Sequence, residues 1–525
     1  MAQIPDPPMT ANPRNLDPSL GARKLSVDLP FEAFHLLVLL GVTLLGAALR
    51  LYQLGEWSLW VDEGHTYRDL MTSDQTFQDS LVTKYPLAYL LMRGFAQIAP
   101  SLGEGWLRLP FAFFGILSVP TLALIGRPLV GRAAALIAAL LLAVSPWHIY
   151  WSQNCRAYAL VLFLALLACG AYWRGLERRS LLWLLLAIGL IFLAGLAHAS
   201  AYLLLGACLF HGILLHRLTR AEAKRPFERF FPLLLLFVLA VLTPLLVKHL
   251  LPLLEFFQRA KPEFSLGHLA STTAYFLRMS LVIAALGGAL WLFARGERSA
   301  AFLAAWVVVP VLALAVAAAS ARVKVTAQYA FYVLPAVVLL SAAMIVALHD
   351  RLGGTGPRGR LLSWIPLLIL LFDLLGYDFL YFTRQHGDRP RWREAAQYVA
   401  DQPGDNKLVL TTNAPSLRYY FLTDMVGNPV RGSKGIRVRG LEEWDRRKDP
   451  ATGTFIPGDQ HIRETIAQCQ AEQTTLFVVV TEPELFEKDR DGRMRDFVRS
   501  ELPQVRWYPN WTGPKDMCVL VYRAR

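Results

Sequence analysis

The stretch FEAFHLLVLLGVTLLGAALRLYQLGEWSLWVDE, residues 31–63, decides the fold class, because a bilayer-length apolar run leads directly into a tryptophan-rich segment with two adjacent carboxylates. We predict that residues 31–51 form a transmembrane helix. Asp62 and Glu63 then lie at the membrane edge, where an interfacial aromatic belt with solvated acids is the simplest interpretation. A chemical role for this pair depends on which other side chains reach the same face of the membrane.

The composition of the whole chain indicates a polytopic membrane protein with one water-soluble domain. Of its 525 residues, 54% are hydrophobic and 18% are charged, a balance too apolar for a soluble enzyme of this size. Residues 383–525 nevertheless hold 43 of the 93 Lys, Arg, Asp and Glu residues. We therefore expect a disordered cytoplasmic tail over residues 1–30, a transmembrane domain over 31–382 and an extracytoplasmic domain over 383–525. An amphipathic helical pattern and strand-like runs make this last segment a small α/β domain.

Eleven apolar runs are long enough to cross about 30 Å of hydrocarbon. They cover residues 31–51, 108–126, 133–150, 157–173, 181–198, 200–216, 230–250, 269–293, 300–319, 328–348 and 361–382. A twelfth run, residues 86–100, is only 15 residues long and carries Arg93 in its middle. The fold class expected is therefore a helical membrane protein of about eleven spans.

Basic residues in the short loops predict the orientation of these spans. One alternate set of loops holds 15 Lys and Arg residues and the other set holds 6, which places the first set in the cytoplasm. With a cytoplasmic N-terminus, the run 86–100 cannot cross, and we expect it to lie as an interfacial helix within a first external loop, residues 52–107. The alternative, twelve spans, would move this loop to the cytoplasm. The net charge of +13 lies mostly in such loops, so nucleic-acid binding is not expected.

Several cationic and polar side chains are predicted at the same external face as the acid pair. The candidates are Lys84, Arg108, His148, Arg156, Tyr158, His198, Arg322, Lys324 and Tyr329. Any one arginine can snorkel to water, and each histidine is more simply a hydrogen-bonded interfacial residue than a metal ligand. Together they suit an anionic headgroup delivered from the membrane. A phosphate leaving group needs fixed positive charge, and an acceptor hydroxyl needs a carboxylate as general base.

Other motifs add little to this picture. Neither a zinc-binding His or Cys motif nor a P-loop or Rossmann fingerprint occurs, so no cofactor is predicted and a divalent metal is not indicated. Cys155, Cys169 and Cys208 fit packing positions in or beside apolar helices. Cys469 and Cys518 both lie in the predicted external domain, where an oxidising compartment would allow them to form a disulfide.

Four collinear blocks resemble the GT-C superfamily of membrane glycosyltransferases, in particular the bacterial branch similar to protein O-mannosyltransferases and the lipid A aminoarabinose transferase. The blocks are WVDE (60–63), TKYPLAYLL (83–91), GEGWLRLPFAFFGILSVP (103–120) and SPWHIYWSQNCRAYAL (145–160). The resemblance is close over residues 31–215 and looser to residue 350.

This resemblance implies that a sugar is transferred from a polyprenyl-phosphate donor to an acceptor hydroxyl, with inversion at the anomeric carbon. The transfer would take place at the extracytoplasmic face of the bacterial inner membrane. It implies that Asp62 is the catalytic base or an acceptor-positioning acid and that Glu63 supports the loop. Lys84, Arg108 and Arg156 match basic residues of the family blocks, and Arg156 is the better candidate for binding the donor phosphate.

Departures from the family pattern leave the donor sugar open. Thr83 and Tyr85 stand where related enzymes have Glu and Pro, and Gln328 precedes Tyr329 where many have Arg. These differences argue against aminoarabinose, and the acceptor can be a glycan, a lipid or a protein. The appended α/β domain would help to select that acceptor.

Two other classes of function share some of these sequence features. A transporter or lipid flippase also needs many spans and charged groups, but such proteins generally bind substrate near the midplane between repeated halves, and no internal repeat is seen. A non-catalytic scaffolding homologue is disfavoured by the intact pair Asp62 and Glu63.

Overall fold

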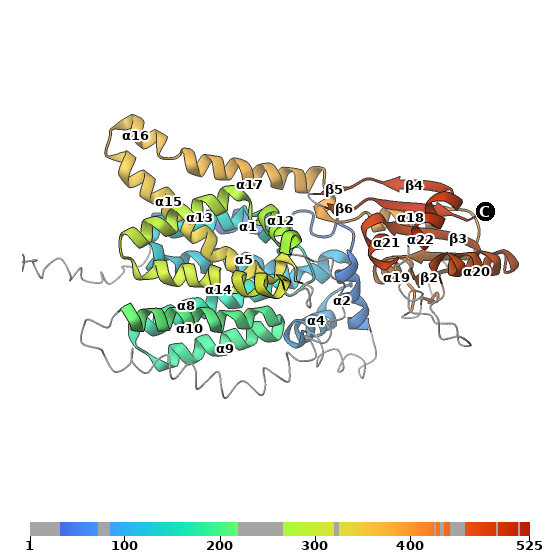
Figure 1. Cartoon of the computed structure of the whole chain (residues 1–525), viewed down its shortest axis with the longest axis horizontal. Coiled ribbons are helices and arrows are strands. Elements are labelled where there is room, and N and C mark those ends of the chain that lie inside the picture. The colour runs from blue at the N-terminus through green and yellow to red at the C-terminus, as the bar shows by residue number, and fades with distance from the viewer. Residues whose placement is uncertain are drawn as a thin grey trace, which may run out of the picture.

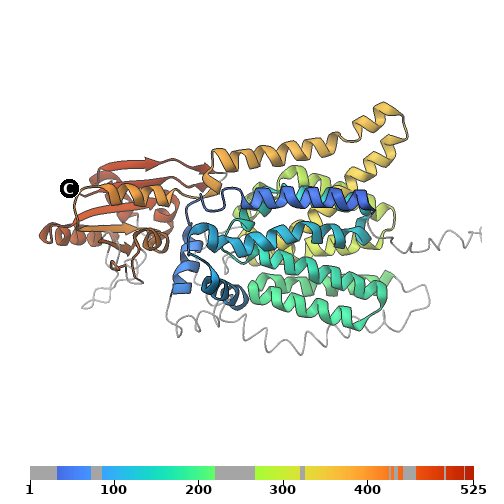
Figure 2. The same ribbon diagram turned by 180° about the vertical axis from the view of Figure 1, so that it is seen from behind.

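A bundle of apolar helices and a small α/β domain make up the protein (Figures 1 and 2). The structure is a computed structural model of the chain, and it describes residues 32–71, 85–218, 266–319, 325–424, 427–430, 435–441, 457–489, 492–512 and 515–524. The predicted tail 1–30 and the apolar run 230–250 lie outside these residues.

The helices of the bundle form where the sequence is continuously apolar, because a backbone in hydrocarbon must satisfy its hydrogen bonds within the segment. The long helices are α1 (Ala33–Leu51), α5 (Glu104–Val130), α6 (Arg132–Ala143), α8 (Tyr158–Arg178), α9 (Leu181–Ala197), α10 (Leu203–Leu218), α12 (Leu266–Leu277), α13 (Met279–Ala294), α14 (Arg298–Ala319), α15 (Leu334–Gly353) and α17 (Ile365–Thr383). Short helical segments between them are α7 (Pro146–Ser152), η2 (Ala199–Tyr202), η4 (Ala327–Val333) and α16 (Pro357–Leu362).

The number of spans can be judged only over the part of the chain that the structure describes. There, six helices are long and apolar enough to cross a membrane, or up to eight if each of two bent pairs counts as one span. The bends are 59° between α6 and α7 and 85° between α12 and α13. At the second bend Arg278 has φ 61°, a left-handed conformation that interrupts a helix. The protein is therefore a multi-pass helical membrane protein, as predicted, while the count of eleven stays a prediction.

Two further helices, α2 (Val61–Met71) and α4 (Pro86–Ile98), lie at the end of the bundle that faces the α/β domain (Figures 1 and 2). Helix α2 begins with Asp62 and Glu63 in its first turn, where carboxylates interact favourably with the helix dipole. Helix α4 has Pro86 at its start and is 13 residues long, too short to cross the bilayer.

The α/β domain is a mixed sheet with helices on both faces. Its strand order is β2-β1-β3-β7-β4, with β1 parallel to β2 and β3, and β7 antiparallel to β3 and β4. A separate hairpin joins β5 and β6. The strands are β1 (Lys407–Thr411), β2 (Ile436–Gly440), β3 (Thr475–Thr481), β4 (Gln504–Tyr508), β5 (Trp511–Thr512), β6 (Lys515–Asp516) and β7 (Val519–Arg523). The helical segments are η5 (His386–Asp388), α18 (Trp392–Asp401), α19 (Ala414–Phe421), α20 (Gly458–Ala471), α21 (Glu482–Lys488) and α22 (Arg493–Glu501).

The α/β domain has two apolar cores because side chains along its central strands point alternately to the two faces of the sheet. Leu408 and Leu410 of β1 join one apolar cluster with residues of α20 and α22. Val409, between them, belongs to a second cluster with residues of α18 and α19. Successive side chains of a strand point to opposite faces, so a run of buried residues requires helices on both sides.

Cys469 and Cys518 do not form the disulfide that the sequence left open. All five cysteines are thiols outside any disulfide bond. Cys469 packs within the cluster formed with α20 and α22, whereas the Cys518 sulfur accepts a hydrogen bond from the Asn510 backbone N–H at 3.3 Å. Each thiol therefore has its own buried environment.

Candidate active site

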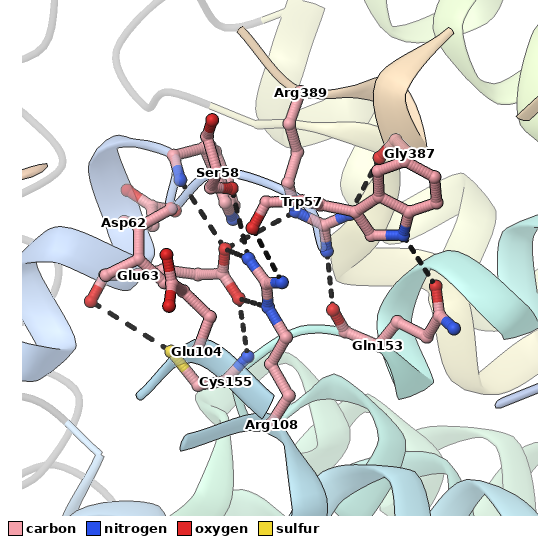
Figure 3. Close-up of polar contacts among 12 residues, drawn as sticks. Trp57, Ser58, Asp62, Glu63, Glu104, Arg108, Gln153, Cys155, Gly387 and Arg389 are labelled. Carbon is pink, nitrogen blue, oxygen red and sulfur yellow. Dashed lines mark hydrogen bonds and ion pairs between the residues drawn. The ribbon is translucent and has the colours of Figure 1, made fainter. Parts of the chain in front are cut away.

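The two adjacent carboxylates on α2 have different surroundings. Glu63 is fully buried, whereas the Asp62 side chain is 34% exposed. Neighbouring residues of a helix point about 100° apart, so one member of the pair can face the protein interior while the other stays accessible. Figure 3 shows the carboxylate of Glu63 among the guanidinium groups of Arg108 and Arg389.

Glu63 is held by groups from three other segments. Arg108 donates from Nε to Oε1 and from Nη2 to Oε2, both at 2.8 Å, and the Cys155 backbone N–H donates to Oε1 at 3.0 Å. Arg389 Nε donates to Oε2 at 3.3 Å. Burial alone would raise the pKa of Glu63, but Arg108 and Arg389 outweigh it and hold the pKa at about 2. Glu63 is therefore a structural carboxylate that stays ionised, consistent with its expected supporting role.

Arg108 does not have the geometry expected of a phosphate-binding residue. Its side chain is fully buried, and besides Glu63 it donates to the carbonyls of Leu54, Trp57 and Ser58 at 2.9–3.0 Å. All three guanidinium nitrogens thus already have protein acceptors. Arg108 fastens the loop before α2 to the start of α5, and phosphate binding by this residue stays a prediction from the sequence.

Asp62 faces Arg156, as expected from the family blocks. Arg156 lies in the loop between α7 and α8, and its Nε is 3.9 Å from Asp62 Oδ2. Its Nη1 donates to Thr66 Oγ1 at 3.2 Å, and its guanidinium carbon is 5.4 Å from the ring centroid of Tyr85. The Arg156 side chain keeps 13% of its surface exposed. This guanidinium is therefore positioned by weak contacts and remains able to bind an anion.

An aromatic cluster surrounds this arginine, with His198 at its centre. The imidazole ring stacks on Tyr85 at 5.1 Å between centroids, and lies 5.1 Å from the ring of Tyr158 and 4.8 Å from that of Tyr329. These residues come from the start of α4, the start of α8, the α9–η2 junction and η4. The structure therefore brings three predicted site residues, Tyr158, His198 and Tyr329, close to Arg156. Lys84, Arg322 and Lys324 lie outside the described residues.

His148 is not part of this cluster, contrary to the expectation that it reaches substrate. It is fully buried on α7, where its Nδ1 lies 2.5 Å from Arg50 Nη2 and its ring stacks on Phe331 at 5.8 Å. An imidazole enclosed between a guanidinium and an aromatic ring packs α7 against α1 and η4.

Arg389 is a site residue that the sequence reasoning missed. It follows η5, beyond the last helix of the bundle, and is fully buried. Besides Glu63, it donates from Nη2 to the Gln153 carbonyl at 2.6 Å and from Nη1 to the Gly387 carbonyl at 2.7 Å (Figure 3). The segment RQHGDRPRWR, residues 384–393, contains four arginines, and nothing in the sequence singles this one out.

The α/β domain contacts α2 directly through α19. The Tyr420 hydroxyl accepts a hydrogen bond from the Leu59 backbone N–H at 2.7 Å, and the rings of Tyr67 and Tyr419 meet edge to face at 4.8 Å. Gly64 packs so closely that an added Cβ would lie 2.6 Å from the Ser416 nitrogen. The residue after Glu63 is thus a contact point between the two parts of the protein.

Comparisons with known proteins show which proteins this arrangement resembles. Residues 83–248 match the sequence profile of the dolichyl-phosphate-mannose-protein mannosyltransferase family. The structure is similar to ArnT from Cupriavidus metallidurans in the apo state, with 14% identity, TM-score 0.53, and coverage of 93% of this chain and 97% of that one. It is also similar to the Archaeoglobus fulgidus oligosaccharyltransferase in the apo form, with 14% identity, TM-score 0.52, and coverage of 85% and 69%. Among curated proteins, none matches the chain.

The likeness to these solved structures shows the fold, which is the GT-C fold predicted from the sequence. The family profile matches residues 83–248 of the chain, a segment that includes Arg156. The match to a transferase profile favours an enzyme over a transporter.

Proposed function

We propose that this enzyme transfers a sugar from a polyprenyl-phosphate donor to an acceptor hydroxyl on the extracytoplasmic face of the membrane, with inversion at the anomeric carbon. The observation that carries the proposal is the pairing of Asp62 with Arg156 at the end of the bundle, 3.9 Å apart and both partly exposed. A carboxylate for the acceptor and a fixed cation for the leaving group are the two charges that this chemistry needs.

Arg156 is the phosphate-binding residue of the proposal. A contact of 3.9 Å to a one-third exposed carboxylate is a weak ion pair, so a lipid phosphate can replace Asp62 as its partner. A guanidinium binds phosphate through two parallel N–H donors, which fixes the orientation of the phosphate as well as its position. Lys84, which precedes Tyr85 in the chain, is proposed as a second phosphate-binding residue.

The reaction then proceeds by in-line displacement. The acceptor hydroxyl gives its proton to the Asp62 carboxylate while the oxygen forms a bond to the anomeric carbon. The bond between that carbon and the phosphate oxygen breaks, and its electron pair leaves on the lipid phosphate, where Arg156 balances the developing charge. Attack opposite to the leaving group inverts the anomeric configuration.

The aromatic cluster supplies the walls of the donor site. Tyr158, His198 and Tyr329 present ring faces and polar edges close to Arg156. Such surfaces pack against the apolar face of a sugar ring while their hydroxyl and imidazole groups remain able to form hydrogen bonds to it. These three residues are proposed to contact the sugar next to the phosphate. Arg322 and Lys324 stay proposed substrate-binding residues on the grounds of the sequence alone.

For the location, we propose the bacterial inner membrane, with residues 31–382 as the transmembrane catalytic domain. The basic loops predict a cytoplasmic N-terminus and an extracytoplasmic domain over residues 383–525. This orientation puts α2, α4 and α19 on the side where a lipid-linked donor and an acceptor glycan, lipid or protein would meet. The contact of α19 with α2 supports a role of the α/β domain in acceptor selection.

The proposal is tested by incubating the purified full-length protein in lipid nanodiscs with a panel of radiolabelled undecaprenyl-phosphate sugars and with total envelope glycolipids as acceptors. We expect consumption of one donor and release of undecaprenyl phosphate. The anomeric configuration of the new linkage, read by NMR, should be opposite to that of the donor. Retention of configuration would exclude the single displacement, and consumption of none of the donors would overturn the proposed donor class.

A further inference from the structure

Arg389 connects the two loops that carry the proposed catalytic charges. On one side its Nε donates to Glu63 Oε2 at 3.3 Å, and Glu63 directly follows Asp62. On the other side its Nη2 donates to the Gln153 carbonyl at 2.6 Å, and Gln153 begins the loop that leads to Arg156. Figure 3 shows this guanidinium between the two segments.

We propose that Arg389 is a positioning residue for sugar transfer, which fixes the carboxylate of Asp62 relative to the guanidinium of Arg156. This inference rests on the proposed function. It assigns to the segment after the last bundle helix a part in catalytic geometry, in addition to any part in acceptor selection.

The rigid fork of an arginine suits this position. A planar guanidinium can donate in several fixed directions at once, which a lysine cannot do. Arg389 also donates from Nη1 to the carbonyl of Gly387 in its own segment, and its guanidinium carbon lies 5.0 Å from the ring centroid of Tyr150. These contacts hold its orientation, so that its two remaining donors define the separation between α2 and the α7–α8 loop.

The hydrogen bonds of Arg389 are not the only contacts between α2 and the α7–α8 loop. The Cys155 backbone N–H also donates to Glu63 Oε1, and Arg108 holds both carboxylate oxygens. Removing Arg389 therefore loosens the site without dismantling it. Catalysis is sensitive to such loosening, because a displacement of about 1 Å in the reacting groups can lower the rate about 100-fold.

The α/β domain in turn holds Arg389. Asn510, which precedes β5, donates from Nδ2 to the Arg389 carbonyl at 2.5 Å and to the Gln385 carbonyl at 3.1 Å. Its side chain is buried at this junction. Docking of the α/β domain thereby fixes the backbone from which Arg389 reaches the two catalytic loops.

Arg393 provides a matched control at the same junction. Its guanidinium donates to Glu104 Oε1 at 2.7 Å, to the Gly55 carbonyl at 2.7 Å and to the Glu56 carbonyl at 2.9 Å. It thus also ties the segment after α17 to the first loop, but at a different point. Losing it tests what weaker docking alone does to the enzyme.

The test compares Arg389→Gln, Arg389→Lys, Asn510→Ala and Arg393→Gln in the full-length protein in nanodiscs. For Arg389→Gln we expect kcat for donor consumption to fall about 10- to 100-fold, while KM for the donor and the binding of tritiated undecaprenyl phosphate change less than about threefold. Asn510→Ala should act in the same direction to a smaller extent, and Arg393→Gln should stay near the wild-type kcat.

The pH–rate profile separates positioning from a merely structural role. Arg389 is one of two cations that keep Glu63 ionised, so Arg389→Gln should move the acid limb of the profile to higher pH. Arg389→Lys keeps the charge and should leave the acid limb in place, yet it should still lower kcat because it loses the bond to Gln153.

Hydrogen–deuterium exchange supplies a readout that does not require turnover. Arg389→Gln should increase exchange in residues 60–71 and 153–157, whereas Arg393→Gln should not. Unchanged exchange of these two segments in Arg389→Gln would overturn the positioning role. An equal loss of kcat in Arg389→Gln and Arg393→Gln would also overturn it. Increased exchange in a protein that consumes no donor would support the link that Arg389 makes between Glu63 and Gln153. Such a result would count only against the proposed function.

Discussion

Arg156 Nε lies 3.9 Å from Asp62 Oδ2 at the end of the bundle beside the α/β domain, a distance that permits attraction but exceeds that of a direct hydrogen bond. Glu63, the neighbour of Asp62, is by contrast bound through two 2.8 Å hydrogen bonds from Arg108. One carboxylate of the pair is thus available for chemistry, and the other is committed to structure.

Because Arg156 makes only weak contacts within the protein, we predict that its replacement weakens donor binding. Arg156→Gln should weaken the binding of undecaprenyl phosphate about 10- to 100-fold, because a charge-assisted hydrogen bond to phosphate contributes about 1.5–3 kcal/mol. Arg156→Lys should recover part of the loss. Arg68, on α2 and paired with Asp69 at 2.7 Å, is the control, and Arg68→Gln should bind normally. Equal affinities for all variants in a filter-binding assay would argue against Arg156.

The burial of Glu63 predicts a large loss of stability on neutralisation. Glu63→Gln would leave Arg108 and Arg389 without their carboxylate in a fully buried site. Breaking a buried ion pair by removing one partner costs about 3–5 kcal/mol. We therefore expect a clear drop in the unfolding temperature of the detergent-solubilised protein. Asp62→Asn, at the exposed member of the pair, should leave that temperature within about 2 °C of wild type. A variant Glu63→Gln as stable as wild type would contradict this account.

Asp388 predicts a pH dependence of stability. Burial raises its pKa to about 7, although the Tyr377 hydroxyl and Arg389 oppose the rise. The folded state therefore holds a proton that the unfolded state releases near pH 4, and the free energy of unfolding should decrease as pH rises from about 4 to about 7. In Asp388→Asn this decrease should be smaller, as measured by unfolding temperatures between pH 5 and pH 8. Parallel curves for the two proteins would count against a raised pKa.

The close contact of Gly64 predicts a packing defect. In Gly64→Ala the new Cβ would meet Ser416 nitrogen and Oγ at 2.6 and 2.7 Å, so α19 must move away from α2. Such overpacking costs about 1–3 kcal/mol, and proteolysis between α17 and the α/β domain should become faster. Gly94 on α4 has no atom within 4 Å of an added Cβ, so Gly94→Ala should show wild-type proteolysis. Equal rates in both variants would mean that the α2–α19 contact is not tight.

The sequence was informative wherever local pattern determines structure. Apolar runs predicted where the long helices of the bundle lie, and the Pro-terminated short run at 86–100 predicted a helix too short to span. The pair formed by Asp62 and Arg156 followed from matching blocks far apart in the chain. Each of these inferences used residue type and spacing alone, which are visible without tertiary structure.

The sequence could not show which side chains are already engaged in contacts within the protein. The family blocks favoured Arg156 over Arg108 for phosphate binding, but only the three carbonyls around Arg108 reveal that its donors are used internally. Arg389 lies among four similar arginines, and its role depends on a fold that brings residue 389 to Glu63. Nor could the sequence show that His148 packs against Arg50, because that contact depends on how the helices pack.

The proposed roles of Asp62 in activating the acceptor and of Arg156 in binding the donor phosphate both predict the outcome of a sugar-transfer assay. Transfer of radiolabelled sugar from the undecaprenyl-phosphate donor that the wild type consumes should be compared for wild type, Asp62→Asn and Glu56→Gln, the last being a control for an exposed acid in the same loop. We predict that the rate of sugar transfer falls about 100- to 10,000-fold in Asp62→Asn, while undecaprenyl phosphate binding is retained. Transfer by Glu56→Gln should be near normal. Near-normal transfer by folded Asp62→Asn would contradict the proposed role of Asp62.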